Sequence, residues 1–322
     1  DGFIGRFVRG EMEYMLVALP LEDDLRYYRE VGRGARLQWL DLDPAQARSL
    51  AAALAENAKP ENARYRYDYY TDNCASRVRD AIDRALGGQL RRQLDVRSSG
   101  DTYRTESVRL ASPAAWMRVG FDLGLGPFAD RPLTRWQQAF LPRRLADDLR
   151  EATRADGRPL VAEEIELLPQ RQAAEPVGRA PRLWPWLLAG VLAGTAVLVL
   201  AGWRPRLLAG FAGAFWATCG LLGLVLALGW AFTAHHALWA NRNLLLLNPL
   251  CLALMPGAWA LLRGRMPSSR FRMVLIVIAA MAALACLPLW LQAQPQRNGH
   301  WIALLLPIHA ALARAWARRP HA

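Results

Sequence analysis

The 322-residue chain is strongly basic overall, with 40 Lys and Arg residues against 28 Asp and Glu, but the charge is unevenly divided. All 28 acidic residues lie in residues 1–179 together with 28 basic ones, whereas the remaining 143 residues contain 12 arginines and no acid. A nucleic-acid-binding protein gathers Lys and Arg on a folded soluble face. The distribution therefore excludes that class and indicates a soluble part followed by a membrane part.

The soluble part, residues 1–167, is predicted to form one extracytoplasmic α+β domain of short strands and helices. One or two strands are expected within residues 1–20, and a helix, begun by Asp43 and Pro44, over residues 43–58. Residues 89–111 look irregular, and Ser112 is expected to cap the next helix. The remaining predictions are helices at 24–31, 74–86 and 133–152 (in two pieces around Pro142), and strands at 36–42, 65–69 and 158–169.

After a polar linker at residues 168–182, residues 183–322 are predicted to form an all-α bundle of about five transmembrane helices. A bilayer core requires about 20 apolar residues per helix. Arginine-rich connections remain in the cytoplasm, which places residues 1–167 and the His235–Asn243 loop outside it. No signal peptide precedes the exported part, so we expect a truncated N-terminus. The apolar runs are Leu183–Trp203, Leu207–Phe232, Leu244–Leu262, Met273–Leu291 and the shorter Trp301–Trp316.

Cys74 is the only cysteine in the first 218 residues, so it has no disulfide partner within its domain. Asp72 and Asn73 precede a predicted helix and can cap it, and a thiol in the first turn of a helix is favoured as the thiolate. Arg77 and Arg79 add positive charge. This placement suits a thiol nucleophile. The alternative is a buried cysteine acting as a small hydrophobe. No histidine lies in residues 1–180 to serve as its base.

A second polar group lies between two predicted spans and consists of His235, His236, Asn241 and Asn243. Polar residues at membrane depth are often functional, so this group either binds a lipid or lipoprotein head group, or approaches Cys74, or forms an ordinary interfacial loop. Two adjacent histidines without Cys, Asp or Glu nearby make a poor metal site. We therefore expect no metal and no cofactor.

Several segments together resemble the Lnb-type lipoprotein N-acyltransferase family. "YDYYTDNCASRVRDAID" (residues 67–83) resembles the Tyr/Asn-Cys motif of the Lnb N-terminal periplasmic domain. "GFIGRFVRGEMEYMLV", "LQWLDLDPAQARSLAAAL", "DTYRTESVRL" and "DLGLGPFADRPLTRWQQAFLPRRLADDLREA" are similar to further parts of such proteins. In the membrane half, "TAHHALWANRNLLLLNPLCLALMP" resembles their His-and-Asn segment.

The resemblance implies a permuted papain-like thiol fold, with a catalytic histidine upstream of the cysteine that has no counterpart in this sequence. If these residues are the whole protein, the resemblance predicts a dead active site. The implied activity is transfer of a fatty acyl chain from a phospholipid to the N-terminal amine of a lipoprotein at the bacterial inner membrane. By the resemblance Cys74 is the acyl-carrying nucleophile, with Asp72, Asn73 and Tyr67 in supporting positions.

Two other functions remain open at the level of sequence. One is a membrane-tethered periplasmic cysteine peptidase or amidase on the same fold, since a fold does not determine the acceptor. The other is a non-catalytic membrane scaffold with a decayed site. Only a transferase leaves the acyl group on an N-terminal amine.

Overall fold

The structure, a computed structural model, describes residues 2–17, 19–96, 100–178, 180–287 and 296–317. The chain forms two compact units: unit 1 is Asp1–Glu106 with Pro132–Val177, and unit 2 is Ser107–Arg131 with Gly178–Ala322. Unit 1 mixes helices with short strands and unit 2 is helical among its described residues, which confirms an α+β part followed by a helical part. The papain-like arrangement stays a prediction. Residues 107–131, which we expected in the extracytoplasmic domain, pack with the helical unit.

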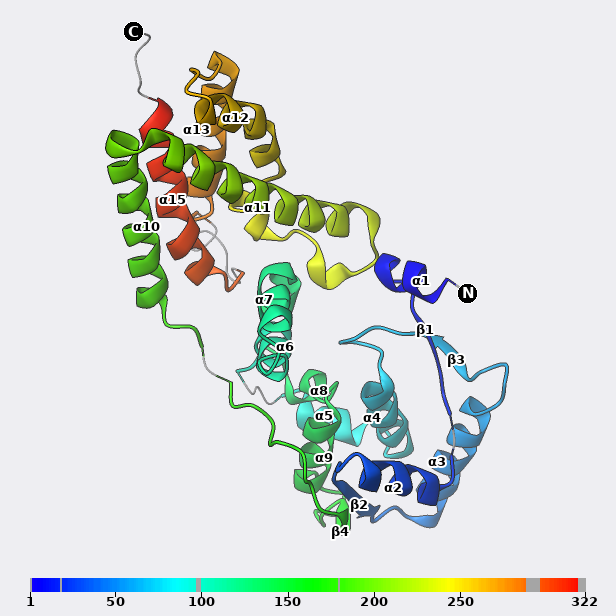
Figure 1. Cartoon of the computed structure of the whole chain (residues 1–322). Coiled ribbons are helices and arrows are strands. Elements are labelled where there is room, and N and C mark those ends of the chain that lie inside the picture. The colour runs from blue at the N-terminus through cyan, green and yellow to red at the C-terminus, as the bar shows by residue number, and fades with distance from the viewer. Residues whose placement is uncertain (1, 18, 97–99, 179, 288–295, 318–322) are drawn as a thin grey trace. The chain divides into compact units, whose positions relative to one another are not determined.

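The strands of unit 1 form two antiparallel pairs (Figure 1). β1 (Glu13–Met15) pairs with β3 (Arg64–Arg66), and β2 (Ala35–Leu40) pairs with β4 (Val161–Leu168). The second pair confirms the strands predicted at residues 36–42 and 158–169. β1 also confirms a strand within residues 1–20, but the helix α1 (Phe3–Arg9) that precedes it was not predicted. Gly2 and Gly10, both in the left-handed conformation, delimit this short helix.

The helices of unit 1 largely begin where their capping residues predicted. The Asp43 carboxylate accepts hydrogen bonds from the N–H groups of Ala45 and Gln46 at the start of α3. Helix α4 begins at Cys74 and ends before Gly87 and Gly88, both of which have positive φ. The other helices that lie wholly in this unit are α2 (Leu21–Glu30), α5 (Gln89–Leu94), α8 (Arg135–Gln138) and α9 (Pro142–Glu151), with α3 spanning Pro44–Asn57 and α4 spanning Cys74–Ala85.

The expectation that residues 89–111 are irregular was wrong. Helices α5 and α6 (Tyr103–Leu110) lie there. Leu90 and Leu94, one helical turn apart on α5, are each 1% exposed. They pack in a core with Ile82 of α4, Leu145 of α9 and other apolar residues, so burial of a single face forms this short helix despite its arginine-rich sequence.

Unit 2 contains α7 (Ala115–Gly124), the short helix η1 (Pro127–Asp130) and the apolar helices of the C-terminal half. Ser112 does not cap α7, contrary to prediction. Ser112 and Pro113 lie in the turn that follows α6, and the N-cap is Ala114, without a side-chain hydrogen bond. The longer helices are α10 (Leu183–Trp203), α11 (Pro205–Phe232), α13 (Ser269–Leu284) and α15 (Gly299–Ala317).

Three segments among the described residues have the length and apolar composition needed to cross a membrane. They are α10, α11 and Arg242–Leu262. The fourth predicted span extends into residues 288–291, outside the described residues, and corresponds in part to α13, while the fifth corresponds to α15. The total of about five spans therefore stays a prediction.

The third of these segments is not one regular helix. It consists of η3 (Arg242–Leu245), η4 (Pro249–Leu254) and α12 (Met255–Leu262). Irregular backbone at membrane depth must be buried in protein or line a cavity, because lipid offers no hydrogen bonds. Here the Leu246 carbonyl lies 2.9 Å from His309 Nε2, and Gly223 of α11 lies so close to Leu247 that a side chain would collide with its carbonyl.

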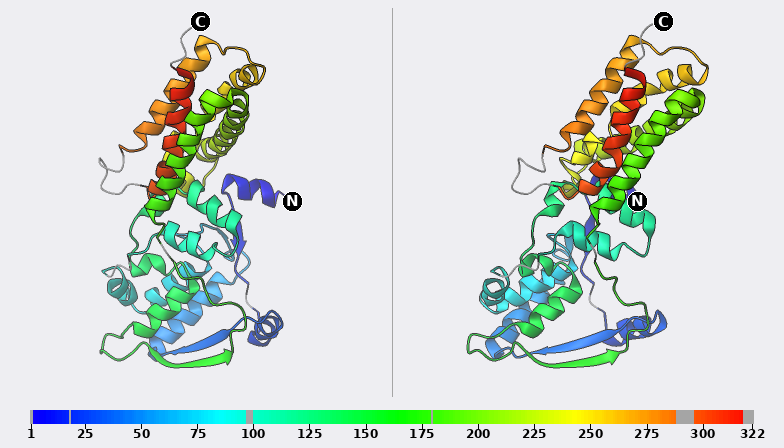
Figure 2. Two further views of the ribbon diagram at one scale, coloured as in Figure 1. Left: turned by 60° about the vertical axis from the view of Figure 1, so that its left-hand side comes forward. Right: turned by 90° about the vertical axis from the view of Figure 1, so that its left-hand side faces the viewer.

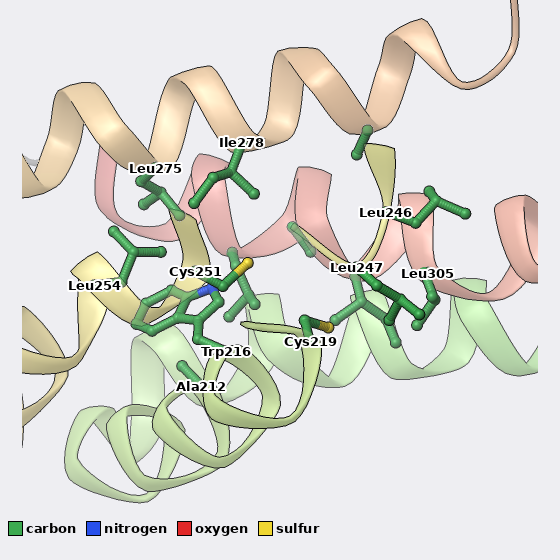
Figure 3. Packing of buried hydrophobic residues seen from close by; sticks show 14 of the residues in the cluster. Ala212, Trp216, Cys219, Leu246, Leu247, Cys251, Leu254, Leu275, Ile278 and Leu305 are labelled. Carbon is green, nitrogen blue, oxygen red and sulfur yellow. The ribbon is translucent and has the colours of Figure 1, made fainter. Parts of the chain in front are cut away.

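Close packing of small residues holds the helices of unit 2 together. Gly190 and Gly194 of α10 lie against backbone carbonyls of α15, where any side chain would collide. A buried apolar cluster fills the space between the other helices (Figure 3). It includes Trp216 and Cys219 of α11, Cys251 of η4, and residues of α13 and α15. These cysteines are buried packing residues, unlike Cys74.

Candidate functional site

The chain reaches Cys74 through a tight turn that follows β3. The Asp68 carboxylate accepts hydrogen bonds from the backbone N–H groups of Tyr70 and Thr71 and from the Thr71 hydroxyl. Asp68 and Asp72 then form an isolated antiparallel bridge. This Asp-based turn ends the tyrosine strand after three residues, earlier than predicted, and directs the chain into α4.

Asn73 fixes the start of α4 as the N-cap residue. Its side-chain oxygen accepts from Ser76 N at 2.9 Å, while Ser76 Oγ accepts from Asn73 N at 2.8 Å, which completes a capping box. The Asn73 amide donates to the carbonyls of Tyr69 and Phe140, each at 2.9 Å. Because Asn73 is only 5% exposed, these contacts tie the turn to the α8–α9 connection in the interior of unit 1.

Cys74 is exposed at the first position of α4, which is against the alternative of a buried packing cysteine. Tyr65 and Tyr67 lie close enough to Cys74 for a negative charge there to act on them. Burial and then that charge raise the pKa of Tyr67 to about 12, and the same two causes raise the pKa of Tyr65. The Tyr67 ring stacks on Tyr14 with 4.1 Å between centroids and meets Tyr69 edge-on. Tyr65 and Tyr67 therefore lie beside the thiol, and Tyr67 in turn packs against Tyr14 and Tyr69.

The two arginines that we expected to place positive charge beside Cys74 are engaged elsewhere. Arg77 forms a bidentate ion pair with Asp72, at 2.7 and 2.9 Å, and lies over the Tyr65 ring. Arg79 is buried, donates to the Trp136 carbonyl at 2.7 Å and pairs with Asp80. Asp72 thus holds Arg77 rather than capping the helix. The first turn of α4 contributes its backbone N–H groups without an acidic side chain.

Within the predicted polar group at the membrane side, the two asparagines bind the backbone at the end of α7. Asn241 Nδ2 donates to the carbonyls of Leu123, Gly124 and Leu125, at 2.8, 2.8 and 3.3 Å. Asn243 Nδ2 donates to the Leu123 carbonyl at 2.9 Å. Both side chains are buried. They bind the last carbonyls of α7, which a helix leaves without intrahelical partners.

The neighbouring histidines lie beside the same segment. His236 meets the Phe128 ring edge-on at 4.5 Å between centroids. The backbone N–H of its neighbour His235 donates to Thr233 Oγ1 at 3.3 Å. Gly126 N donates to the Ala237 carbonyl at 2.7 Å. The loop around these two histidines therefore packs on the segment that follows α7, within unit 2.

Sequence reasoning missed several residues of this arrangement. Asp122 Oδ2 of α7 lies 2.7 Å from His300 Nε2 and accepts from Trp301 Nε1 at 3.1 Å. Asp130 Oδ2 accepts from Arg297 N, and Gln296 Nε2 donates to Asn241 Oδ1. No signal in the sequence pointed to these contacts. Asp122 and Asp130 are the only two acids of unit 2, but residues 107–131 were predicted to belong to the extracytoplasmic domain, among many other acids.

Comparison with known families matches both halves of the chain. Residues 2–112 match the Lnb N-terminal periplasmic domain, and residues 175–318 match the Lnb transmembrane domain. The chain belongs to the Lnb family. No curated protein and no solved structure showed significant similarity to it.

As a member of the Lnb family the chain is a membrane protein with a periplasmic domain, which agrees with the apolar helices of unit 2. The matched periplasmic domain contains Cys74 and its turn, and the matched transmembrane domain contains His235, His236, Asn241 and Asn243. Helix α7 and the segment that Asn241 binds lie between the two matched regions. Among the described residues, no group of three or more His, Cys, Asp or Glu side chains is arranged to hold a metal ion.

Proposed function

We propose that this Lnb family member is a thiol-dependent acyltransferase of the bacterial inner membrane, which modifies lipoproteins. It would carry a fatty acyl chain from a phospholipid, through a thioester on Cys74, to the N-terminal amine of a lipoprotein. The observation that carries the proposal is the exposure of Cys74 at the first position of a capped helix. Family membership supports a membrane-associated, lipoprotein-modifying role.

In the first step Cys74 Sγ attacks the carbonyl carbon of a phospholipid ester. The S–C bond forms, the ester C–O bond breaks, and the lysophospholipid leaves with a proton on its oxygen. In the second step the lipoprotein amine attacks the thioester, a C–N bond forms, the C–S bond breaks, and the thiol is restored. Division into two steps through a covalent intermediate is the advantage of nucleophilic catalysis.

The first turn of α4 can stabilise the oxyanion that develops in both steps. The first N–H groups of a helix have no intrahelical partner. Ser76 N already binds the Asn73 side chain, which leaves the N–H groups of Cys74 and Ala75 as the donors at this turn. The tyrosine rings beside Cys74 offer an apolar surface with polar rims, which suits an acyl chain that ends in an ester.

We assign no general base, because unit 1 contains no histidine. The carboxylate of Asp72, which could otherwise act as the base in place of a histidine, is paired with Arg77. The proposal therefore depends on a thiolate formed with help from outside the described residues of unit 1, and the experiment below tests the thioester directly.

The test is hydroxylamine release of an acyl label. The full chain, in detergent with a phospholipid that carries a labelled acyl chain, is compared with Cys74→Ser and with the control Cys286→Ser, a partly exposed cysteine of unit 2. We expect label on the unsubstituted chain and on Cys286→Ser, released by neutral hydroxylamine, and none on Cys74→Ser. Label that persists in Cys74→Ser, or no label with any donor phospholipid, would overturn the proposal and favour the peptidase or the scaffold.

A second readout identifies the acceptor. A diacylated lipopeptide with a free N-terminal amine is added to the labelled protein, and products are identified by mass. Label on the amine supports a transferase, whereas release of free fatty acid only, with the amine unmodified, indicates a hydrolase.

A further inference from the structure

Helix α7 exposes most of its apolar side chains although it is held firmly at one end. Trp116 is 76% exposed, and Met117, Val119 and Phe121 are 37–38% exposed; we call these four residues the apolar face of α7. None of the ten residues of the helix is buried. A ten-residue helix is marginal in water by itself and draws its stability from packing of its apolar face. Something must therefore cover this face.

The C-terminal end of α7 is fixed at the ends of apolar helices. Asp122 binds His300 and Trp301 in the first turn of α15, and Asn241, in the loop that follows α11, binds the carbonyls of residues 123–125. Figure 2 shows α7 at the end of this helical unit where α10 and α15 begin. Because α11 has the length and composition of a membrane span, the end of α7 lies at the level of the membrane surface.

The length of α7 keeps its apolar face close to that level. The eight helical steps from Trp116 to Gly124 cover about 12 Å at 1.5 Å per residue. The interfacial layer on each side of a bilayer core is about 5–8 Å thick. Even in its least favourable orientation α7 places Phe121, and in most orientations all four apolar residues, within reach of the lipid.

The charges of α7 suit contact with phospholipid head groups. Arg118 and Asp122, four residues apart, share one side of the helix, and Asp122 is used in the contacts with α15. Unit 2 has one other acid, Asp130, which is hydrogen-bonded to Arg297 N. The surface beside α7 therefore carries arginine charge that attracts phospholipid phosphates, and tryptophan is enriched at this depth of membranes.

We propose that α7 is an interfacial helix whose apolar face, Trp116, Met117, Val119 and Phe121, lies among the acyl chains of the outer leaflet phospholipids. Asn241, Asn243 and Asp122 are its positioning residues, because they bind the polar end of the helix and leave its apolar side free. The partner is the lipid surface itself. This inference needs only that unit 2 spans a membrane and holds whether or not Cys74 transfers acyl groups.

Photo-crosslinking tests this proposal with a matched pair of tryptophans. A benzophenone amino acid replaces Trp116 in one full-length variant and Trp39, which is 57% exposed on β2 of unit 1, in another. Both are reconstituted in nanodiscs of phosphatidylethanolamine and phosphatidylglycerol, illuminated and analysed by intact mass. We expect about tenfold more phospholipid adduct from position 116, as for a residue buried at the acyl boundary.

Equal yields of phospholipid adduct at the two positions would overturn the proposal, as would adducts at 116 that join only protein, whether within the chain or to a second copy. Retention of the fold is checked by the reaction of exposed Cys74 with maleimide, which should be equal in both variants. If the probe at 116 prevents folding, the same comparison with the probe at Phe121 decides between lipid and protein.

Discussion

The turn before Cys74 and the end of α7 are each built around one buried asparagine, yet they expose opposite kinds of surface. Asn73 binds two carbonyls and caps the start of α4, where the side chain of Cys74 is exposed. Asn241 binds three carbonyls at the end of α7, so that polar backbone is covered and apolar side chains face outward. The same type of side chain thus supports an exposed thiol in one place and an exposed apolar face in the other.

The largest expected effect is that of Asn73→Ala. The substitution removes the N-cap and leaves the carbonyls of Tyr69 and Phe140 without their amide partner, which should cost about 2–4 kcal/mol of unfolding free energy. Thermal unfolding of the full chain, followed by tryptophan fluorescence, measures the loss. Asn62→Ala is the control, because the Asn62 amide binds the Glu56 carbonyl at an exposed site. Equal shifts for the two variants would show that Asn73 does not hold the turn.

At the other asparagine, Asn241→Asp should be more harmful than Asn241→Ala. Alanine removes the donor and should cost about 1–3 kcal/mol. Aspartate keeps the oxygen that accepts from Asn243 N and Gln296 Nε2, but it turns a second oxygen towards three carbonyl oxygens. The comparison is made by thermal unfolding in the same detergent. A smaller loss for aspartate would mean that the acceptor contacts of Asn241 dominate.

A smaller effect is expected at Asp122. Asp122→Asn keeps a carbonyl oxygen that can accept from Trp301 Nε1, so we expect a loss of about 1 kcal/mol, whereas Asp122→Ala removes the acceptor and should cost more. Both losses should appear in unit 2, seen as faster proteolysis of the α7 segment, while maleimide labelling of Cys74 stays unchanged. Equal proteolysis of the two variants would show that this acceptor is not important.

The smallest expected effect is on the pH dependence of stability. Ionisation of the tyrosines near Cys74 should not change the stability at neutral pH, but it should lower it in alkali. Burial raises the pKa of Tyr67 and Tyr69 to about 12, above the ordinary value of 10. A raised pKa in the folded state means that their contribution to stability is complete below pH 10 and is lost as the pH rises towards 12. Absorbance at the tyrosinate band should show this late titration, and it should move to lower pH after Tyr14→Ala, which opens the stack.

The sequence predicted the elements with strong local signals. Asp43 with Pro44, and Asn73 with the glycine pair at 87–88, determined the limits of α3 and α4 because capping acts within a few residues. Strands were predicted at residues 36–42 and 158–169, where β2 and β4 lie, but their pairing across more than 120 residues was not. Helices α1 and α5 were not predicted, because a helix of one or two turns is too short for its apolar pattern to repeat.

The candidate site was predictable on the Cys74 side and much less so in unit 2. Asn73, Cys74 and Tyr67 are close in sequence, so a local turn suffices to gather them. The partners of Asn241 are carbonyls more than 110 residues away, and backbone acceptors leave no trace in residue type. Arg77 and Arg79, which we expected to add positive charge beside Cys74, are paired with Asp72 and Asp80, and Arg79 also lies over the Trp136 ring.

The glycines of α10 also have a consequence for how the protein is made. Gly190 and Gly194 lie against carbonyls of α15, so the first apolar helix of the C-terminal half finds its close partner in the last one. During synthesis α10 leaves the ribosome more than 90 residues before α15 is complete. Until then its glycine stripe faces lipid or another helix, and assembly of unit 2 ends only when the C-terminal helix arrives, which makes that helix the step on which quality control of the nascent protein would act.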